Sequence, residues 1–230
     1  PCRLICLCLR VFPAAFWHVR YICALTLTRI EGWQMQNYDF FINLILSVIL
    51  IVGVYQFYFF TQRYTLVEIR TFNSRLDEKM PFWPSWSWIY SFLYYPAILY
   101  INWLVEDPRD FTITAFTYIV LLVMQMICFS AFPVSTPEHW RSINTGSNWS
   151  ERFLLFVQKF DAPSNCFPSM HVSVATLTAL LALNSLGPWV FLFPVLIALS
   201  CTFTKQHYLA DLPAGAALGW VAYQVYLLLI

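Results

Sequence analysis

The chain has 230 residues, of which 60% are hydrophobic, 19% aromatic and 11% charged, whereas soluble domains carry roughly 25% charged residues. This composition argues against an ordinary water-soluble globular protein. Thirteen Lys and Arg against twelve Asp and Glu leave a formal net charge of +1. No basic tract could neutralise a phosphate backbone, so we expect no nucleic-acid partner. The seven cysteines contain no repeated Cys-x-x-Cys, which excludes the signature of a zinc ribbon.

Long uncharged segments dominate the sequence. A bilayer core about 30 Å thick is spanned by about 20 apolar residues in a helix. Five segments lack Lys, Arg, Asp and Glu over at least a comparable length: 40–60, 86–105, 111–134, 165–204 and 212–230. The fourth is long enough for two helices, and it carries Gly187-Pro188 near its middle. Because the residue before a proline disfavours a continuing helix, this segment predicts a hairpin of helices over 169–185 and 188–204.

The predicted fold is all-α, an integral membrane bundle of six helices. Lipid cannot satisfy free backbone groups, and the segments lack the alternation of barrel strands. We assign the six-span domain to residues 38–230, with Asp211 as the N-cap of the last helix and Pro213 in its first turn. Residues 1–37 are interpreted as an N-terminal extension, since Met35 stands just before the first span.

The connection between the third and fourth spans is long for a compact bundle. Asn148 and Glu151 have the spacing of a capping box, and the apolar side chains that follow form one stripe of a helix over 149–160. Arg152 and Lys159 lie opposite this stripe. The pattern predicts an amphipathic helix that lies in the membrane interface between spans three and four.

A polar motif opens the first helix of the predicted hairpin. The segment 165–171 reads Asn-Cys-Phe-Pro-Ser-Met-His and places Ser169 and His171 at a membrane boundary. The free N–H groups and the dipole of a helix N-terminus attract an anion, and the Ser169 hydroxyl adds a donor. This motif predicts a phosphate site, with a hydrogen-bonded interfacial histidine as the alternative.

A second polar motif lies between the last two predicted helices. His207 and Asp211 are four residues apart, so they lie within one turn. The carboxylate can hold the imidazole in one tautomer and stabilise its positive form. A solvated ion pair is the alternative. Because His171 opens one helix of the hairpin and His207 follows the end of its antiparallel partner, we expect both on one membrane face, around one phosphate.

In this order, the two motifs resemble those of the type 2 phosphatidic acid phosphatase superfamily of membrane lipid phosphatases and phosphotransferases, over about residues 38–230. Pro168-Ser-Met-His171 is similar to the family's Pro-Ser-Gly-His, with Met in the Gly position. Ser200-Cys201-x5-His207-x3-Asp211 is similar to Ser-Arg-x5-His-x3-Asp, with Cys201 in the Arg position. The His-Tyr-x2-Asp string at 207–211 resembles the branch that contains inositol phosphorylceramide synthases.

The family's first motif, Lys-x6-Arg-Pro, has no good match in this chain. In the branch just named, a Tyr/Phe-Pro segment followed by an Arg often takes that place, and Phe132-Pro133 followed by Arg141 is the nearest candidate. Arg141 is therefore our choice for the phosphate clamp, and Ser169 and Lys205 are expected to bind phosphate as well. Arg152 and Lys159 are alternative clamps, and a plain surface cation is the competing interpretation of each.

The resemblance implies two-step phosphoryl transfer, in which His207 forms a phosphohistidine, Asp211 orients it and His171 protonates the leaving alkoxide. We expect no cofactor and no metal ion, because the sequence offers no concentrated carboxylate set for magnesium. The leading hypothesis is a lipid phosphate phosphatase that acts on phosphatidic acid, a polyprenyl diphosphate or a similar lipid. A lipid headgroup phosphotransferase is the alternative, and a non-enzymatic transporter or degenerate homologue is the second. The expected partners are the lipid phosphate substrate and membrane lipids.

The side of the membrane is inferred from the family. The connections 61–85, 135–164 and 205–210 share one side of a six-span bundle, and their Lys and Arg counts of 4, 3 and 1 would place that side in the cytoplasm. The family usually has its site outside the cytoplasmic membrane or in a lumen. We follow the family, since some of these cations belong to the expected site and residues 1–37 carry further basic residues.

Overall fold

The computed structural model describes the backbone of residues 16–72, 74–105 and 107–230, and the side chains from residue 39 onward within those ranges. The chain divides into two units, residues 1–43 and 44–230. The described residues of the first unit are helical and belong to α2 (Phe16–Arg63). The predicted extension over 1–37 therefore lies partly outside the described residues.

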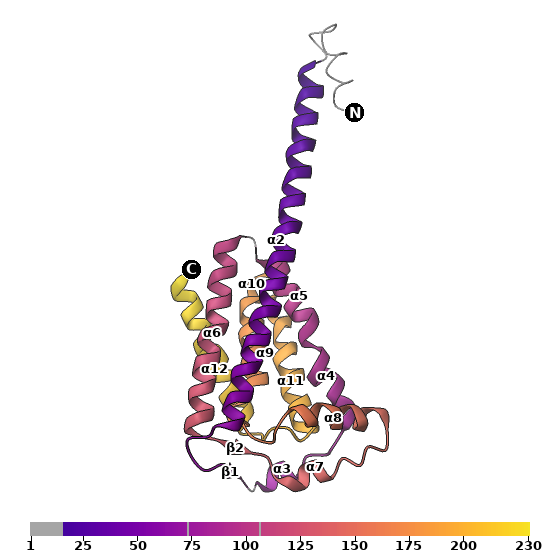
Figure 1. Ribbon diagram of the computed structural model, residues 1–230. Coiled ribbons are helices and arrows are strands. Elements are labelled where there is room, and N and C mark those ends of the chain that lie inside the picture. Colours follow the sequence, from indigo (N-terminus) through magenta and orange to yellow (C-terminus); the bar gives the residue numbers. More distant parts are fainter. Residues whose placement is uncertain (1–15, 73, 106) are drawn as a thin grey trace. The chain divides into compact units, whose positions relative to one another are not determined.

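The second unit is a bundle of helices. Within the described part of the chain, the segments long and apolar enough to cross a membrane are Asp39–Arg63 within α2, Pro108–Ala131 (α6), Leu183–Phe203, and Asp211–Leu229 (α12). Met170–Leu181 (α9) is a shorter apolar helix. α9 packs against α6, α11 and α12 in the middle of the bundle (Figure 1). The mostly helical fold and the long apolar helices agree with the sequence-based prediction.

The predicted second span is divided into shorter elements. They are η1 (Pro84–Trp86), α4 (Ser87–Phe92) and α5 (Tyr94–Leu104). Pro96 gives the physical reason, because a proline ring clashes with the carbonyl group four residues earlier. That residue is Phe92, where α4 ends.

The predicted hairpin is also built from more pieces than expected. After α9 come α10 (Leu183–Leu186), η2 (Gly187–Phe191) and α11 (Leu192–Phe203). Gly187 has φ +63°, a left-handed conformation that favours glycine. The chain reverses through α10 and η2, and α11 then packs back against α9 (Figure 1).

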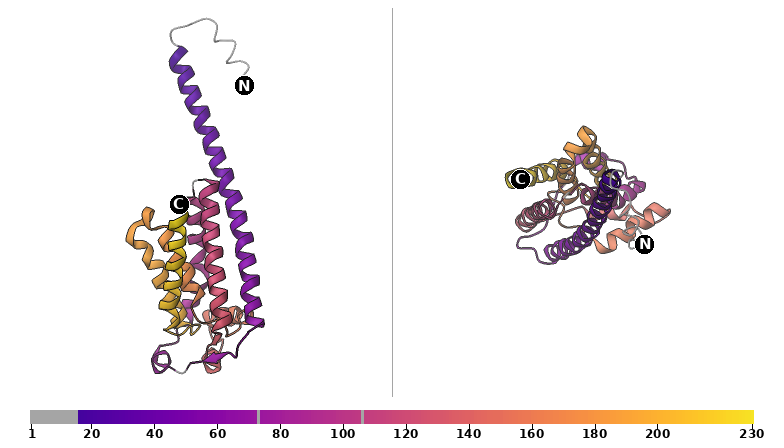
Figure 2. Two further views of the ribbon diagram at one scale, coloured as in Figure 1. Left: turned by 90° about the vertical axis from the view of Figure 1, so that its left-hand side faces the viewer. Right: turned by 90° about the horizontal axis from the view of Figure 1, so that it is seen from above.

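The connections after α2 and after α6 lie at the same end of the second unit (Figure 2). β1 (Arg70–Thr71) pairs in parallel with β2 (Val134–Ser135), so the connection after α2 is joined to the one after α6. The short helices α3 (Arg75–Lys79) and α7 (Glu138–Ser142) follow these strands. These two connections thus form a common platform beneath the bundle.

The predicted helix over 149–160 is confirmed as α8 (Trp149–Phe160). The Asn148 side chain accepts a hydrogen bond from the backbone N–H of Glu151 at 2.9 Å, and the Glu151 carboxylate accepts one from the N–H of Ser147 at 2.9 Å. The ring of Phe153 stacks on Trp88 with centroids 4.3 Å apart. One face of α8 is therefore fixed against α4.

Two glycines let α12 approach α9 closely. A Cβ atom at Gly215 would lie 2.4 Å from the Ser169 carbonyl oxygen, and one at Gly219 would lie 2.4 Å from the carbonyl oxygen of Ser173. A side chain at either position would force the backbones apart. The backbone N–H of Ser169 also donates to the Asp211 carbonyl at 3.0 Å, so the first turns of α9 and α12 are held together.

The polarity of the second unit is arranged as in a protein dissolved in lipid. Large apolar side chains such as Ile45, Ile49 and Val52 point outward and are more than half exposed. Many buried polar groups are paired inside; the Gln125 amide, for example, donates to the Pro168 carbonyl at 2.6 Å. Such pairing satisfies polar groups where no water can reach them.

Candidate active site

The turn that carries His207 begins where α11 ends. The N–H of Gln206 donates to the carbonyl of Cys201 at 3.0 Å, and that of Lys205 donates to the carbonyl of Thr202 at 3.1 Å. This pair of hydrogen bonds is the Schellman arrangement, which ends a helix with one left-handed residue. Lys205 takes that conformation with φ +58°. The chain therefore reverses sharply after α11, and this turn keeps His207 close to the C-terminal end of that helix.

His207 is fixed in one tautomer. Its Nδ1 lies 2.9 Å from the carbonyl oxygen of Cys166 and 3.3 Å from Oδ2 of Asp211. A carbonyl oxygen can only accept a hydrogen bond, so Nδ1 carries the proton, and in the neutral imidazole the lone pair is on Nε2. The side chains of His207 and Asp211 are 6% and 1% exposed, which makes this a buried pair rather than a solvated one.

Asp211 holds its carboxylate toward the turn. The prediction that Asp211 is the N-cap of the last helix is wrong by one residue, because α12 begins at Asp211 and Ala210 is the cap. The carboxylate points backward, and Oδ2 accepts the N–H of Tyr208 at 2.9 Å. Bonding to the preceding turn, instead of to the helix, is what brings the carboxylate to His207.

His171 lies in the first turn of α9, beside a group of aromatic side chains. The Tyr90 hydroxyl lies 3.4 Å from its Nδ1, and the hydroxyl of Tyr94 donates to its carbonyl oxygen at 2.6 Å. The imidazole rings of His171 and His207 have centroids 5.7 Å apart. The two imidazoles are therefore close neighbours, and of the two only His207 lines the cavity beside them.

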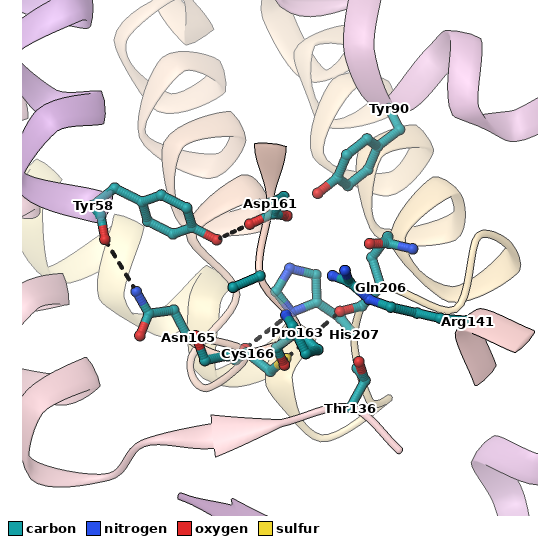
Figure 3. Close-up of a pocket in the computed structure, with 12 residues that line it drawn as sticks. Tyr58, Tyr90, Thr136, Arg141, Asp161, Pro163, Asn165, Cys166, Gln206 and His207 are labelled. Carbon is teal, nitrogen blue, oxygen red and sulfur yellow. Dashed lines mark hydrogen bonds between the residues drawn. The ribbon is translucent and has the colours of Figure 1, made fainter. Parts of the chain in front are cut away.

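A cavity opens beside His207 (Figure 3). Its wall includes Arg141 from α7, Asp161 from the end of α8, Tyr58 from α2 and Tyr90 from α4. The Arg141 side chain extends toward His207 in Figure 3. Its Nη1 donates to the Gln158 carbonyl at 3.2 Å, while its buried Nε has no partner. An anion in the cavity would therefore meet the Arg141 guanidinium and the His207 imidazole.

Comparison with known proteins identifies the family. A model described as the PAP2 superfamily matches residues 62–225, which is well over half of the chain. The chain belongs to the PAP2 superfamily. Searches of curated proteins and of solved structures found no match. Members of the PAP2 superfamily are phosphatases and phosphotransferases, so the chain is an enzyme of this general kind. Its long apolar helices fit an integral membrane protein.

The cations predicted for the PAP2 site differ in where they lie. Arg141 lines the cavity, whereas Lys205 does not. The Lys205 ammonium donates to the backbone carbonyl of Asp77 and sits 4.9 Å above the ring of Trp140. Burial lowers the pKa of this ammonium. The Lys205 side chain therefore contacts α3 and α7, which belong to the platform, and does not face the cavity.

The other predicted phosphate-binding residues also lie outside the cavity wall. Ser169 is fully buried as the N-cap of α9, and its hydroxyl accepts the N–H of Val172 at 3.4 Å. Arg152 donates from Nε to the Gly146 carbonyl at 3.1 Å. Lys159 lies on α8 without a place in the wall. Among the predicted cations, the structure brings Arg141 to His207.

Among the cavity residues that sequence analysis missed are one acidic residue and two tyrosines. Oδ1 of Asp161 accepts hydrogen bonds from the Tyr58 hydroxyl and from the Gln62 amide, both at 2.8 Å. Tyr90 faces the same cavity. Asp161 directly follows the amphipathic helix, which was a usable signal, because it is an acidic residue at a predicted membrane boundary. The two tyrosines lie in aromatic-rich spans that gave no such signal.

The turn that carries His207 is held by the connections after α2 and after α6. Oδ1 of the buried Asp77 accepts the N–H of Leu209 at 2.7 Å. The Tyr208 hydroxyl donates to the Ser135 carbonyl at 3.0 Å and accepts the N–H of Phe72 at 3.1 Å. Burial raises the pKa of this hydroxyl, so it stays protonated. The paired connections therefore fix the residues on both sides of His207.

Proposed function

We propose that the chain is a membrane lipid phosphate phosphatase that acts through a phosphohistidine on His207. The observation that carries the proposal is the hydrogen bond of His207 Nδ1 to the Cys166 carbonyl, which leaves the lone pair of Nε2 for attack. Phosphatidic acid, polyprenyl diphosphates and similar lipids are the proposed substrates. The apolar helix faces around the site suit a substrate that stays in the bilayer.

The chemistry follows in two steps. Nε2 of His207 attacks phosphorus and the bond to the lipid oxygen breaks, while His171 gives a proton to the leaving alkoxide. Water then attacks the phosphohistidine, His171 takes a proton from that water, and His207 is released with inorganic phosphate. Asp211 stabilises the imidazolium form, and Arg141 faces the charge on the phosphoryl oxygens. Ser169 and Lys205 act at a distance, by fixing α9 and the catalytic turn.

A headgroup phosphotransferase is the second candidate, and two further residues of the cavity wall favour it. Asp161 and Tyr58 place a carboxylate and a hydroxyl in the same cavity wall as Arg141. These groups can bind the hydroxyl of an acceptor alcohol, which would take the phosphoryl group in place of water. The resemblance to inositol phosphorylceramide synthases points in the same direction.

We propose that the second unit and the preceding turn of α2 cross the membrane six times. The crossings would be Asp39–Arg63, α4 with α5, α6, α9 with α10, α11 and α12, and α8 would lie in the interface. The site would face the outside of the cytoplasmic membrane or a lumen. An Ile143→Cys variant tests the side, because Ile143 is exposed beside α7. Labelling of intact cells by an impermeant reagent supports this topology, and labelling only after permeabilisation contradicts it.

The test of function is release of inorganic phosphate from a panel of lipid monophosphates and diphosphates in EDTA. We expect release by the wild type and none by His207→Ala, with an acid-labile phosphoprotein trapped in the wild type alone. His139→Ala is the matched control, because His139 is an exposed histidine paired with Glu78 away from the cavity. Transfer to an added alcohol without phosphate release would favour the phosphotransferase. Equal activity of the His207→Ala variant would reject the mechanism.

A further inference from the structure

Cys201 has no role in the chemistry above, yet its thiol lies beside both histidines. One ring nitrogen of His171, the Cys201 sulfur and one ring nitrogen of His207 all lie within 4.8 Å of one another. Cys201 is fully buried in α11, and His207 is buried as well. We propose that His171, Cys201 and His207 form a zinc site whose occupancy inhibits the enzyme.

The donor set selects the ion. Two imidazoles and a thiolate suit zinc, whereas magnesium and calcium require oxygen ligands. In a tetrahedral zinc site the ligand atoms stand about 3.3 to 3.6 Å apart, so the three donors need to approach by about 1 Å. Side-chain torsions of the two histidines can supply this movement. The fourth position is left for water, as in zinc sites with three protein ligands.

The surroundings of His207 already have the form of a zinc ligand's supporting shell. A ligating histidine usually donates its other N–H to a carbonyl or carboxylate, which orients the ring. His207 Nδ1 does so toward the Cys166 carbonyl and Asp211, so Nε2 is the nitrogen left for the ion. The carbonyl of Cys201 is held by the N–H of Gln206, which fixes the thiol-bearing backbone relative to the His207 turn.

The positive charge of a bound zinc ion is also balanced by nearby negative groups. Zinc binds the thiolate, so the Cys201 thiol releases one proton to solvent for each ion bound. The charge of the ion is then matched by the thiolate and by the Asp211 carboxylate, whose Oδ1 is buried without a hydrogen-bond partner. The packing of Cys201 against Val172, Ala175 and Ile197 keeps the thiolate side of the site dry.

Inhibition follows from competition for one lone pair. A zinc ion on Nε2 of His207 removes the electrons that would attack phosphorus. This consequence rests on the proposed function of His207, whereas the binding of zinc does not. Removal of zinc by EDTA would restore turnover, so the site acts as a reversible inhibitory device rather than as a cofactor site.

Binding is tested with Co²⁺, whose thiolate complexes absorb in the near ultraviolet. Full-length wild type, Cys201→Ser and the matched control Cys128→Ser are stripped with EDTA, exchanged into buffer and titrated. Cys128 is a half-buried cysteine of α6. We expect wild type and Cys128→Ser to show one more cobalt–thiolate site per chain than Cys201→Ser, and Zn²⁺ to displace it. Zinc affinity at this site should fall at least about 100-fold in Cys201→Ser, since even a supporting residue contributes 10- to 100-fold.

Equal cobalt absorption in wild type and Cys201→Ser would overturn the site. A Cys201→Ala variant serves as a second test of the thiol, and a monodisperse elution profile of every variant shows that it is folded.

In the activity experiment, phosphate release by each variant is compared with and without zinc, and we expect the inhibition constant for zinc to rise about 100-fold in Cys201→Ser. Zinc that binds at Cys201 without slowing phosphate release would overturn the inhibitory role. Absence of phosphate release from every lipid in EDTA would instead reject the proposed function, while the cobalt titration still decides the metal site.

Discussion

The two parts of the candidate site are built in different ways. In one part, His207 lines the cavity, and Asp211 from the same turn and His171 on α9 lie beside it, outside the cavity wall. In the other part, Arg141, Asp161 and Tyr58 line the cavity and come from three segments, α7, the end of α8 and α2. The proposed nucleophile is thus set by local geometry, whereas the proposed phosphate clamp depends on the whole bundle.

The largest expected effect comes from a change in the turn that carries His207 and Asp211. Asp211→Asn can still accept the N–H of Tyr208, but it removes the negative charge that stabilises the imidazolium of His207. We expect kcat to fall about 10⁴-fold, the size of effect seen when a buried carboxylate beside a catalytic histidine is neutralised. Rates of phosphate release in EDTA measure it. A decrease of less than tenfold would show that Asp211 has a structural role alone.

The next effect tests which cation faces the substrate. Arg141→Ala should lower kcat about 10²- to 10³-fold, because it removes a donor aimed at the transition-state charge. Arg152→Ala and Lys159→Ala, which remove cations outside the cavity wall, should change it less than about threefold. The same phosphate-release assay compares the three. A larger decrease of kcat in Arg152→Ala or Lys159→Ala would show that the phosphate clamp lies on α8 instead.

A third prediction concerns the contact that joins α9 to α12. Gly215→Ala places a Cβ against the Ser169 carbonyl, and overpacking of this kind costs about 1–3 kcal/mol. A displacement of His171 by about 1 Å should also lower kcat about 10²-fold. Gly53→Ala is the control, since nothing lies within 4 Å of the added atom. Thermal unfolding and turnover of both variants in detergent check the prediction, and similar behaviour of the two would contradict it.

The smallest expected effect is on the pH dependence of stability, through Glu78 in the platform. Hydrogen bonds from the Trp140 indole and the His139 ring lower the pKa of Glu78 below its ordinary value of 4.5. A carboxyl group with a lowered folded pKa stabilises the fold above pH 4.5, and this contribution is lost as the pH falls through the folded pKa. Glu78→Gln should therefore flatten the acid side of the profile of unfolding temperature against pH. An unchanged slope would exclude Glu78 as its source.

Much of the fold could be predicted from composition and periodicity. The long apolar segments gave α6, α12 and the membrane part of α2, and the capping-box spacing gave α8. The hairpin turn at Gly187-Pro188 was predicted, but the division of this region into α10 and η2 and the break of the second span at Phe92 were not, because they depend on backbone geometry at single residues. The one-residue error at Asp211 has the same cause, since its carboxylate bonds outside its own helix.

The sequence by itself determined the family and the residues proposed to carry its chemistry, because His171, His207 and Asp211 lie in two short motifs whose spacing places them on neighbouring helix ends. Only the tertiary structure decided which cation faces them. The residue type alone does not distinguish the four predicted cations, Arg141, Lys205, Arg152 and Lys159. Lys205 is the nearest of them to His207 in the sequence. Its left-handed backbone turns the ammonium toward Asp77 and Trp140, while the packing of α7 brings Arg141 into the cavity.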